Sequence, residues 1–277
     1  MTIQTDPYIQ QWHIWHAQRI EELTSPHGYL APTSITWIND GQNKTIEGIP
    51  GTWAAEDDSL TYTPEPGSTV INAEKAVDQP IRFTPTAFGE EALGYLEYGD
   101  IRIEVNAQTS LTDQNHHLFW IRVKDPNAPR RQTFTGIDHY PVDPKWRIPA
   151  TFRWAKDDEL DIHDSVVKTV LQSYPVIGFV DFDYSGTHYS LVVSNVFGHV
   201  TVFFTDETTG KETYGIGRVL HLDPLKLDTL DAIDFNYAFN YPCAFSVYCT
   251  CPIPSKRNHL AFAVEAGEKT PDDSAQY

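Results

Sequence analysis

The pattern of apolar side chains over residues 7–24 predicts a helix. Apolar residues recur there at spacings of three and four, and no glycine or internal proline interrupts them. The apolar positions are Tyr8, Ile9, Trp12, Trp15, Ile20 and Leu23. Because residues three or four apart lie on one face of an α-helix, the pattern indicates one amphipathic helix over residues 7–24.

Beyond this helix the chain has the pattern of a β protein. Apolar and charged residues alternate from Ile101 to Val105, which is typical of a half-buried strand, and we predict that this strand covers residues 95–105. Short β-branched and aromatic runs predict further strands at residues 117–123, 176–183, 189–196 and 199–205.

Two more segments complete the fold prediction. Residues 184–187, with the sequence Tyr-Ser-Gly-Thr, have the chemistry of a hairpin turn. Residues 157–173 could form a short helix or two strands, and the β-branched run at residues 166–170 favours strand. We therefore expect a mainly β fold, a β-sandwich or barrel-like assembly with a short N-terminal helix, built either as one body or as two packed β lobes.

Charge narrows the range of partners. The 277 residues include 38 Asp and Glu against 20 Lys and Arg, a formal net charge of −18. A nucleic-acid partner is disfavoured because phosphates require clustered basic residues, and anionic membrane surfaces are disfavoured for the same reason. The chain has neither a signal-peptide pattern nor a run of about 20 apolar residues, so we expect a cytoplasmic protein. Its oligomeric state stays open.

The common catalytic and cofactor motifs are absent. There is no phosphate-binding loop, no zinc-protease motif and no serine-nucleophile elbow. The pair Gly215 and Gly217 resembles a dinucleotide fingerprint, but Leu220 occupies the third glycine position. Residues 181–186 resemble the start of a calcium loop, yet Val192 stands where a bidentate Glu is required. We therefore expect no cofactor.

The cysteines and histidines do not predict a metal site. Four potential zinc ligands lie near the C-terminus, namely Cys243, Cys249, Cys251 and His259. Their spacing matches no common zinc knuckle, and a Cys243–Cys251 disulfide would need a turn between the two residues. Buried free thiols are the simplest interpretation. His13 and His16 share a helical face but flank tryptophans, which favours packing over metal binding.

The segment 200–222 is the first candidate for function. A Thr-Thr-Gly turn divides it, and we predict that a return strand begins at Glu212. On that strand Glu212, Tyr214, Ile216 and Arg218 would share one face. The other face has no side chain at Gly215 and Gly217, which marks close approach of either a ligand or another backbone. Arg218 is the best candidate for contact with an anion.

The segment 234–243 is the second candidate. Its residues alternate, with Asp234, Asn236 and Asn240 on one side and aromatic residues on the other. A row of Asp and Asn side chains is costly to bury without partners. It is therefore either solvated or part of a hydrogen-bonded network at a site, although turns are the alternative at each position.

Both segments resemble those of a known family, the bacterial proteins catalogued as domain of unknown function 1684. The resemblance rests on FTDETTGKETYGIGRVLHLD, on DFNYAFNYPCAF and on CPIPSKRNHLAFAVEAGEK. The family signature falls on Glu212, Gly215, Gly217, Arg218, Asp234, Asn236, Asn240, Cys243, Cys251, Gly267 and Glu268. Val219 replaces a usual Tyr, and Arg257 stands where a Glu normally precedes the Asn. Membership implies no established activity.

The resemblance also bears on domain organisation. Residues 125–149 contain five prolines and predict a structured connection across the middle of the chain. A division near this connection would give sub-lobes 1–145 and 146–277. Because the resemblance runs from about residue 28 to residue 269, it favours a single integrated domain over residues 1–277.

The leading functional hypothesis is a pocket that binds a small polar or anionic molecule. The predicted strand over residues 212–218 and the region 234–268 would form it, with Arg218 as the anion contact. The candidate ligand-binding residues are Glu212, Tyr214, Arg218, Asp234, Asn236, Asn240 and Glu268.

Two alternatives compete with this hypothesis. The first is a hydrolase-like or isomerase-like enzyme with Asp234 or Glu212 as general base, although no catalytic residue is assigned. The second is that the signature residues only specify the fold, through a buried hydrogen-bonded network. An Arg218 guanidinium that is buried and paired within the chain would favour this structural interpretation.

Overall fold

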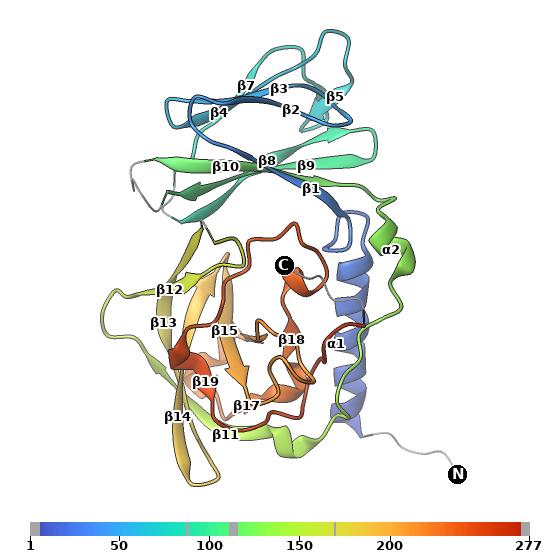
Figure 1. Ribbon diagram of the computed structural model, residues 1–277. Coiled ribbons are helices and arrows are strands. Elements are labelled where there is room, and N and C mark those ends of the chain that lie inside the picture. The colour runs from blue at the N-terminus through green and yellow to red at the C-terminus, as the bar shows by residue number, and fades with distance from the viewer. Residues whose placement is uncertain (1–5, 87–88, 111–115, 169, 273–277) are drawn as a thin grey trace. The chain divides into compact units, whose positions relative to one another are not determined.

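The computed structural model describes residues 6–86, 89–110, 116–168 and 170–272, which form two compact units. The N-terminal unit is Glu22–Phe134, and the composite unit combines Met1–Glu21 with Thr135–Tyr277. Most of the regular structure is strand, so the mainly β prediction is confirmed, and the helix α1, Pro7–Thr24, confirms the predicted helix (Figure 1). A division of the chain at residue 145 does not reproduce these units, because most of α1 groups with the C-terminal half. The expectation of a single integrated domain stays a prediction.

The N-terminal unit is built from two antiparallel sheets. One has the strand order β1-β10-β9-β8-β5-β6 and the other β2-β3-β4-β7. The strands are β1 Pro32–Ile38, β2 Asn43–Ile46, β3 Ile49–Glu56, β4 Ser59–Thr63, β5 Val70–Asn72, β6 Lys75–Ala76, β7 Ile81–Phe83, β8 Glu90–Tyr98, β9 Ile101–Thr109 and β10 His117–Lys124, followed by the short helix α2 Pro129–Thr133. Buried side chains such as Trp53, Leu60, Ile103 and Phe119 form one core cluster.

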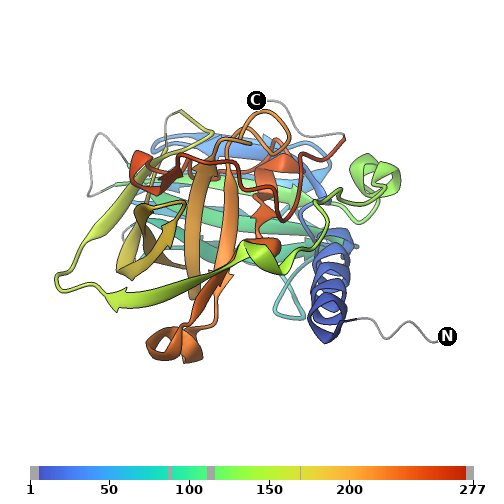
Figure 2. The same cartoon turned by 90° about the horizontal axis from the view of Figure 1, so that it is seen from below.

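The composite unit contains a nine-stranded sheet that curves into a half-barrel (Figure 2). Its strand order is β17-β11-β13-β14-β15-β16-β18, with β12 paired to β13 and β19 paired to β15. The strands are β11 Arg147–Trp154, β12 Leu160–Asp164, β13 Leu171–Tyr184, β14 Thr187–Val196, β15 His199–Asp206, β16 Arg218–Leu222, β17 Ala232–Asp234, β18 Phe239–Asn240 and β19 His259–Leu260. Five short 3-10 helices connect them: η1 Pro144–Trp146, η2 Pro224–Thr229, η3 Phe235–Tyr237, η4 Pro242–Ala244 and η5 Lys256–Asn258.

Most predicted strands lie inside observed ones. The segments 117–123, 176–183, 189–196 and 199–205 fall within β10, β13, β14 and β15. Ser185 and Gly186 have φ of 50° and 80°, as a two-residue hairpin turn requires. The predicted strand 95–105 is wrong in extent, because a turn at residues 99–100 divides it between β8 and β9.

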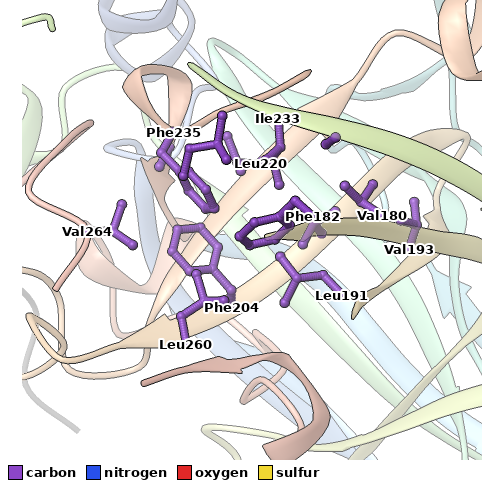
Figure 3. Close-up of a cluster of buried hydrophobic side chains, with 14 of the residues drawn as sticks. Val180, Phe182, Leu191, Val193, Phe204, Leu220, Ile233, Phe235, Leu260 and Val264 are labelled. Carbon is purple, nitrogen blue, oxygen red and sulfur yellow. The ribbon is translucent and has the colours of Figure 1, made fainter. Parts of the chain in front are cut away.

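A cluster of aromatic and aliphatic side chains forms the core of the composite unit (Figure 3). The ring of Phe235 packs on Phe204 and Phe182, at centroid distances of 5.5 and 6.0 Å. Burying one such side chain contributes about 1.5–3 kcal/mol. Because Phe235 belongs to η3, its burial anchors the irregular C-terminal segments to the sheet.

Neither segment singled out for function is one regular strand. Residues 212–217 form turns: the backbone nitrogens of Glu212 and Thr213 donate to Thr208 O, and β16 begins only at Arg218. The predicted shared face of Glu212, Tyr214 and Arg218 is therefore wrong. The local cause is a turn whose backbone groups bond within the segment.

The segment 234–243 is likewise broken, into β17, η3, β18 and η4. The side chain of Asp234 accepts a hydrogen bond from Asn236 N at 3.1 Å, which caps η3. Asp and Asn side chains compete with the sheet for backbone groups, so the alternating pattern did not produce a continuous strand. Within the described residues no helix is long and apolar enough to span a membrane.

Candidate functional site

Arg218 lies at the start of β16 and is fully buried. Its Nη2 donates to Asp206 Oδ2 at 2.5 Å and to Val264 O at 2.8 Å, and its Nη1 donates to Ala266 O. Asp206, at the end of β15, is also buried. Both Nη atoms therefore bond to the chain itself, which is the arrangement expected of the structural interpretation.

The Asp206 carboxylate extends this network into the turn that follows β15. Its Oδ1 accepts from Thr208 N at 2.6 Å and from Thr208 Oγ1 at 2.5 Å. The Oγ1 atoms of Thr208 and Thr213 are 2.8 Å apart. A buried charge pair is thereby joined to two buried threonine side chains of this turn, and such networks specify one packing arrangement.

The two glycines before Arg218 have different surroundings. Gly217 has φ of +113°, and a Cβ there would lie 2.5 Å from Phe204 O, so a neighbouring backbone occupies the space. At Gly215 the nearest atom to such a Cβ is Gly210 Cα, at 3.9 Å. Close approach of another backbone therefore explains Gly217, whereas Gly215 has open surroundings.

Asp234 and Asn236 bind the first turns of α1. Tyr8 Oη donates to Asp234 Oδ2 at 2.8 Å, and Asn236 Nδ2 donates to Tyr8 Oη at 2.9 Å. Trp12 Nε1 donates to Asn236 O at 2.6 Å. Burial, followed by the neighbouring Asp234 carboxylate, raises the pKa of Tyr8, which keeps the hydroxyl protonated as the donor. This polar network therefore binds the N-terminal part of α1.

Asn240 and Glu268 bind the same helix further along. Arg19 Nε donates to Glu268 Oε1 at 2.7 Å, and Arg19 Nη2 donates to Asn240 O at 2.8 Å. Asn240 N donates to the second Glu268 oxygen at 2.7 Å. The Glu268 side chain is fully buried, and the Arg19 guanidinium also lies over the Phe239 ring at 4.5 Å. Asn240 pairs with Arg218 between β18 and β16.

The structure thus separates the seven candidate residues. Asn240 and Glu268 meet beside Arg218, and Asp234 and Asn236 form a second network. Tyr214 is buried and donates to Cys243 O at 3.0 Å, whereas Glu212 is exposed and joins neither network.

Sequence reasoning missed the helix partners of these networks. They are Tyr8, Trp12 and Arg19, together with the Asp206 partner of Arg218. The available signal was the helical face itself, since Tyr8, Trp12 and Arg19 project within roughly 40° of one another at 100° per residue. All three combine an apolar body with a polar tip, as helix anchors do.

His16 occupies the middle of the α1 contact. Its ring stacks on Trp12 at 4.8 Å and lies 5.0 Å from the ring of His139. The residue is 9% exposed, and its Nε2 has no hydrogen-bond partner among the described residues. Burial lowers the pKa of His16, as do His139, Arg19 and His13, whereas Glu268 acts in the opposite direction.

Acidification is therefore expected to loosen α1. The pKa of His16 is about 6.5 in the unfolded chain and lower in the folded one, so the unfolded state binds more protons as pH falls. The stabilisation is complete above about pH 6.5 and is lost as pH falls through the lowered pKa. Hydrogen exchange of residues 7–24 at pH 7.5 and 5.5 measures this, and His16→Gln should flatten the pH dependence. If the protection of residues 7–24 changed with pH as much in His16→Gln as in the unmodified chain, His16 would not be the titrating group.

The three cysteines are free and buried. Burial raises the pKa of the Cys251 thiol well above its usual value, which disfavours the reactive thiolate. No group of three or more His, Cys, Asp or Glu side chains in the described part of the chain is arranged to hold a metal ion.

Fold and site together define a mainly β protein with a helix held on polar C-terminal segments. Residues 132–269 match the family model "Protein of unknown function (DUF1684)", and the chain belongs to this family. A similar solved structure is the solution NMR structure of the uncharacterized protein from gene locus rrnAC0354 of Haloarcula marismortui. It is 30% identical, the match covers 52% of this chain and 80% of that one, and the TM-score is 0.42. No curated protein matches the chain.

Proposed function

We propose that the composite unit is a helix-binding module, in which polar residues of the family region hold α1. The observation that carries this proposal is the pairing of the fully buried Glu268 with Arg19 at 2.7 Å. The matched region 132–269 contains Glu268 but not α1. The acceptor thus belongs to the family region, and the cation comes from the helix.

The carboxylate of Glu268 needs this cation. Burying an ionised carboxylate without a partner costs several kcal/mol. The Nη atoms of Arg218 are directed to Asp206 and to main-chain oxygens, so Arg19 is the side chain that forms an ion pair with Glu268. A helix without a cationic side chain at this position would leave Glu268 without a charged partner. A guanidinium fits best, because two of its nitrogens bond to Glu268 and to Asn240 O at once.

The anchors on α1 match a known mode of helix recognition. Tyr8, Trp12 and Arg19 lie on one helical face, as side chains that enter a receptor surface do. Each forms a hydrogen bond with a segment of the family signature, around residues 234–236 or at Asn240 and Glu268. Trp12 is fully buried, so the contact combines an apolar anchor with directional polar bonds.

The same contacts weigh against the two other functions considered from the sequence. A small anionic ligand at Arg218 would have to displace Asp206 and the main-chain oxygens that the guanidinium already binds. A general base at Asp234 would have to release the hydroxyl of Tyr8. Helix binding uses these residues in the arrangement that they already have.

Removing one anchor tests the proposal. In the full chain, Tyr8→Phe removes a hydroxyl that joins Asp234 and Asn236, and hydrogen bonds to charged groups contribute about 1.5–3 kcal/mol. We expect amide protection in residues 7–24 to fall by about tenfold or more, with β14 and β15 unchanged, as measured by hydrogen exchange. The matched control is Tyr184→Phe, because Tyr184 stacks on Phe262 at 4.1 Å within the same unit. Unchanged helix protection, or an equal loss in the control, would refute helix binding through these contacts.

A further inference from the structure

Strand β12 has the reverse of the usual burial pattern. Its apolar residues Leu160 and Ile162 are 46% and 59% exposed, whereas Asp161 and His163 are 4% and 2% exposed. A half-buried strand normally directs its apolar side chains inward. The outward face of β12 is therefore apolar at the two positions where solvation would favour polar residues.

Buried polar contacts fix this orientation. His163 Nε2 lies 2.8 Å from Asp161 Oδ2, and His163 Nδ1 lies 3.0 Å from Ile253 O. Ser194 Oγ donates to the same Asp161 oxygen at 3.5 Å. Rotating the strand to bury Leu160 and Ile162 would break these contacts, since a shift by one residue moves every side chain to the other face. The exposure of the apolar pair is thus built into the fold.

The spacing of the exposed pair suits an extended partner. Leu160 and Ile162 are two residues apart, about 6.6 Å along a strand. The β13 residue opposite Leu160 is Pro175, which is also exposed and lies on the same face. An extended segment that carries apolar side chains at alternate positions would place them at the same interval.

Charge around this face determines the kind of partner. The exposed acids Asp157, Asp158 and Glu159 precede the apolar pair, and Asp164 follows it. Glu159 already pairs with Arg257 at 2.5 Å. The exposed bases Lys156 and Lys168 lie at the two ends of this stretch. The three remaining acids outnumber these two bases by one, so a second copy of the same strand would meet like charges and a basic segment opposite ones.

We propose that the outward face of β12 docks an extended segment of a partner protein, with alternate apolar side chains flanked by Lys or Arg. The apolar side chains would cover Leu160 and Ile162, and the basic ones would pair with Asp157, Asp158 and Asp164. This docking site is independent of the α1 contact.

A labelled peptide binding to the full chain tests the proposal. The probe is the octapeptide Lys-Lys-Val-Thr-Val-Thr-Lys-Lys, and its comparison peptide has Glu in place of every Lys. Fluorescence anisotropy should show saturable binding of the basic peptide, weakened about tenfold in Leu160→Thr/Ile162→Thr and further weakened by salt. Threonine is β-branched and therefore favours strand at both positions. The matched control is Leu225→Thr, because Leu225 is 92% exposed at another place in the composite unit.

Four outcomes would overturn the proposal. They are an absence of saturable binding, equal binding of the acidic peptide, equal weakening in the Leu225→Thr control, and unchanged binding in the β12 variant. Sedimentation adds a further measurement. A concentration-dependent dimer that Ile162→Thr abolishes would identify a second copy as the occupant and contradict a basic partner.

Discussion

Replacing Arg218 with methionine is expected to lower the free energy of unfolding of the composite unit by about 3–5 kcal/mol. The guanidinium and the Asp206 carboxylate are both fully buried at the side-chain level and 2.5 Å apart. Methionine fills a similar volume but leaves the carboxylate in the protein interior without its cation. Main-chain oxygens of residues 264 and 266 lose their donors in the same step. Hydrogen exchange of β15 and β16 amides at increasing urea concentrations measures the loss.

An exposed ion pair in the same unit provides the control. Arg153 lies 3.0 Å from Asp181 with about half of its side chain exposed, and Arg153→Met should change the free energy of unfolding by about 0–1 kcal/mol. If Arg218→Met lowered the free energy of unfolding as little as Arg153→Met does, the structural interpretation of Arg218 would be wrong. The anion-binding hypothesis would then regain support.

Periodicity and β-branched composition explain which elements were predictable from the sequence. The helix over residues 7–24 has apolar residues three and four positions apart, and β13 alternates between buried and less buried positions. β14 and β15 instead contain runs of buried β-branched and aromatic residues. The hairpin at Ser185 and Gly186 was equally accessible, because its turn chemistry is local. In these elements, local preference and tertiary packing agree.

The two signature segments were mispredicted because their polar residues act on the backbone. Asp234 caps η3, and in the other segment the side chains of Asp206 and Thr209 accept hydrogen bonds from the backbone nitrogens of Thr208 and Asp206. An alternating pattern records which residues are polar, but not whether a side chain bonds to its own backbone or to a distant group. The alternating pattern therefore identified the polar residues of these segments but predicted the wrong backbone geometry for them.

The partners of the candidate residues could not be predicted from spacing. Tyr8 and Asp234 are 226 positions apart, and Arg19 and Glu268 are 249 apart. The intervening chain includes the whole N-terminal unit, Glu22–Phe134. Sequence pattern could identify an amphipathic helix and a polar row separately. Only the fold shows that the polar row binds the helix.

A double-mutant cycle on Arg19 and Glu268 is expected to give a large coupling energy, with different costs for the two single variants. Arg19→Met should cost about 3–5 kcal/mol, because the fully buried Glu268 keeps its charge without the cation. Glu268→Gln should cost less, since Arg19 is 12% exposed and the amide oxygen still accepts a hydrogen bond. The double variant should lose at least about 1 kcal/mol less than the sum of the two, a coupling of the size found for residues in contact. Hydrogen exchange of residues 7–24 and of β16 reports both the helix and the sheet.

A second cycle in the same unit distinguishes helix docking from surface electrostatics. Arg147 and Asp231 are 2.6 Å apart but 47% and 75% exposed at their side chains, so their coupling should be small and weaken further with salt. The coupling of Arg19 with Glu268 should change little with salt, because the carboxylate is removed from solvent. Additive effects of Arg19→Met and Glu268→Gln would mean that the ion pair does not hold α1. That result would contradict the helix-binding proposal, because this pairing is the observation that carries it.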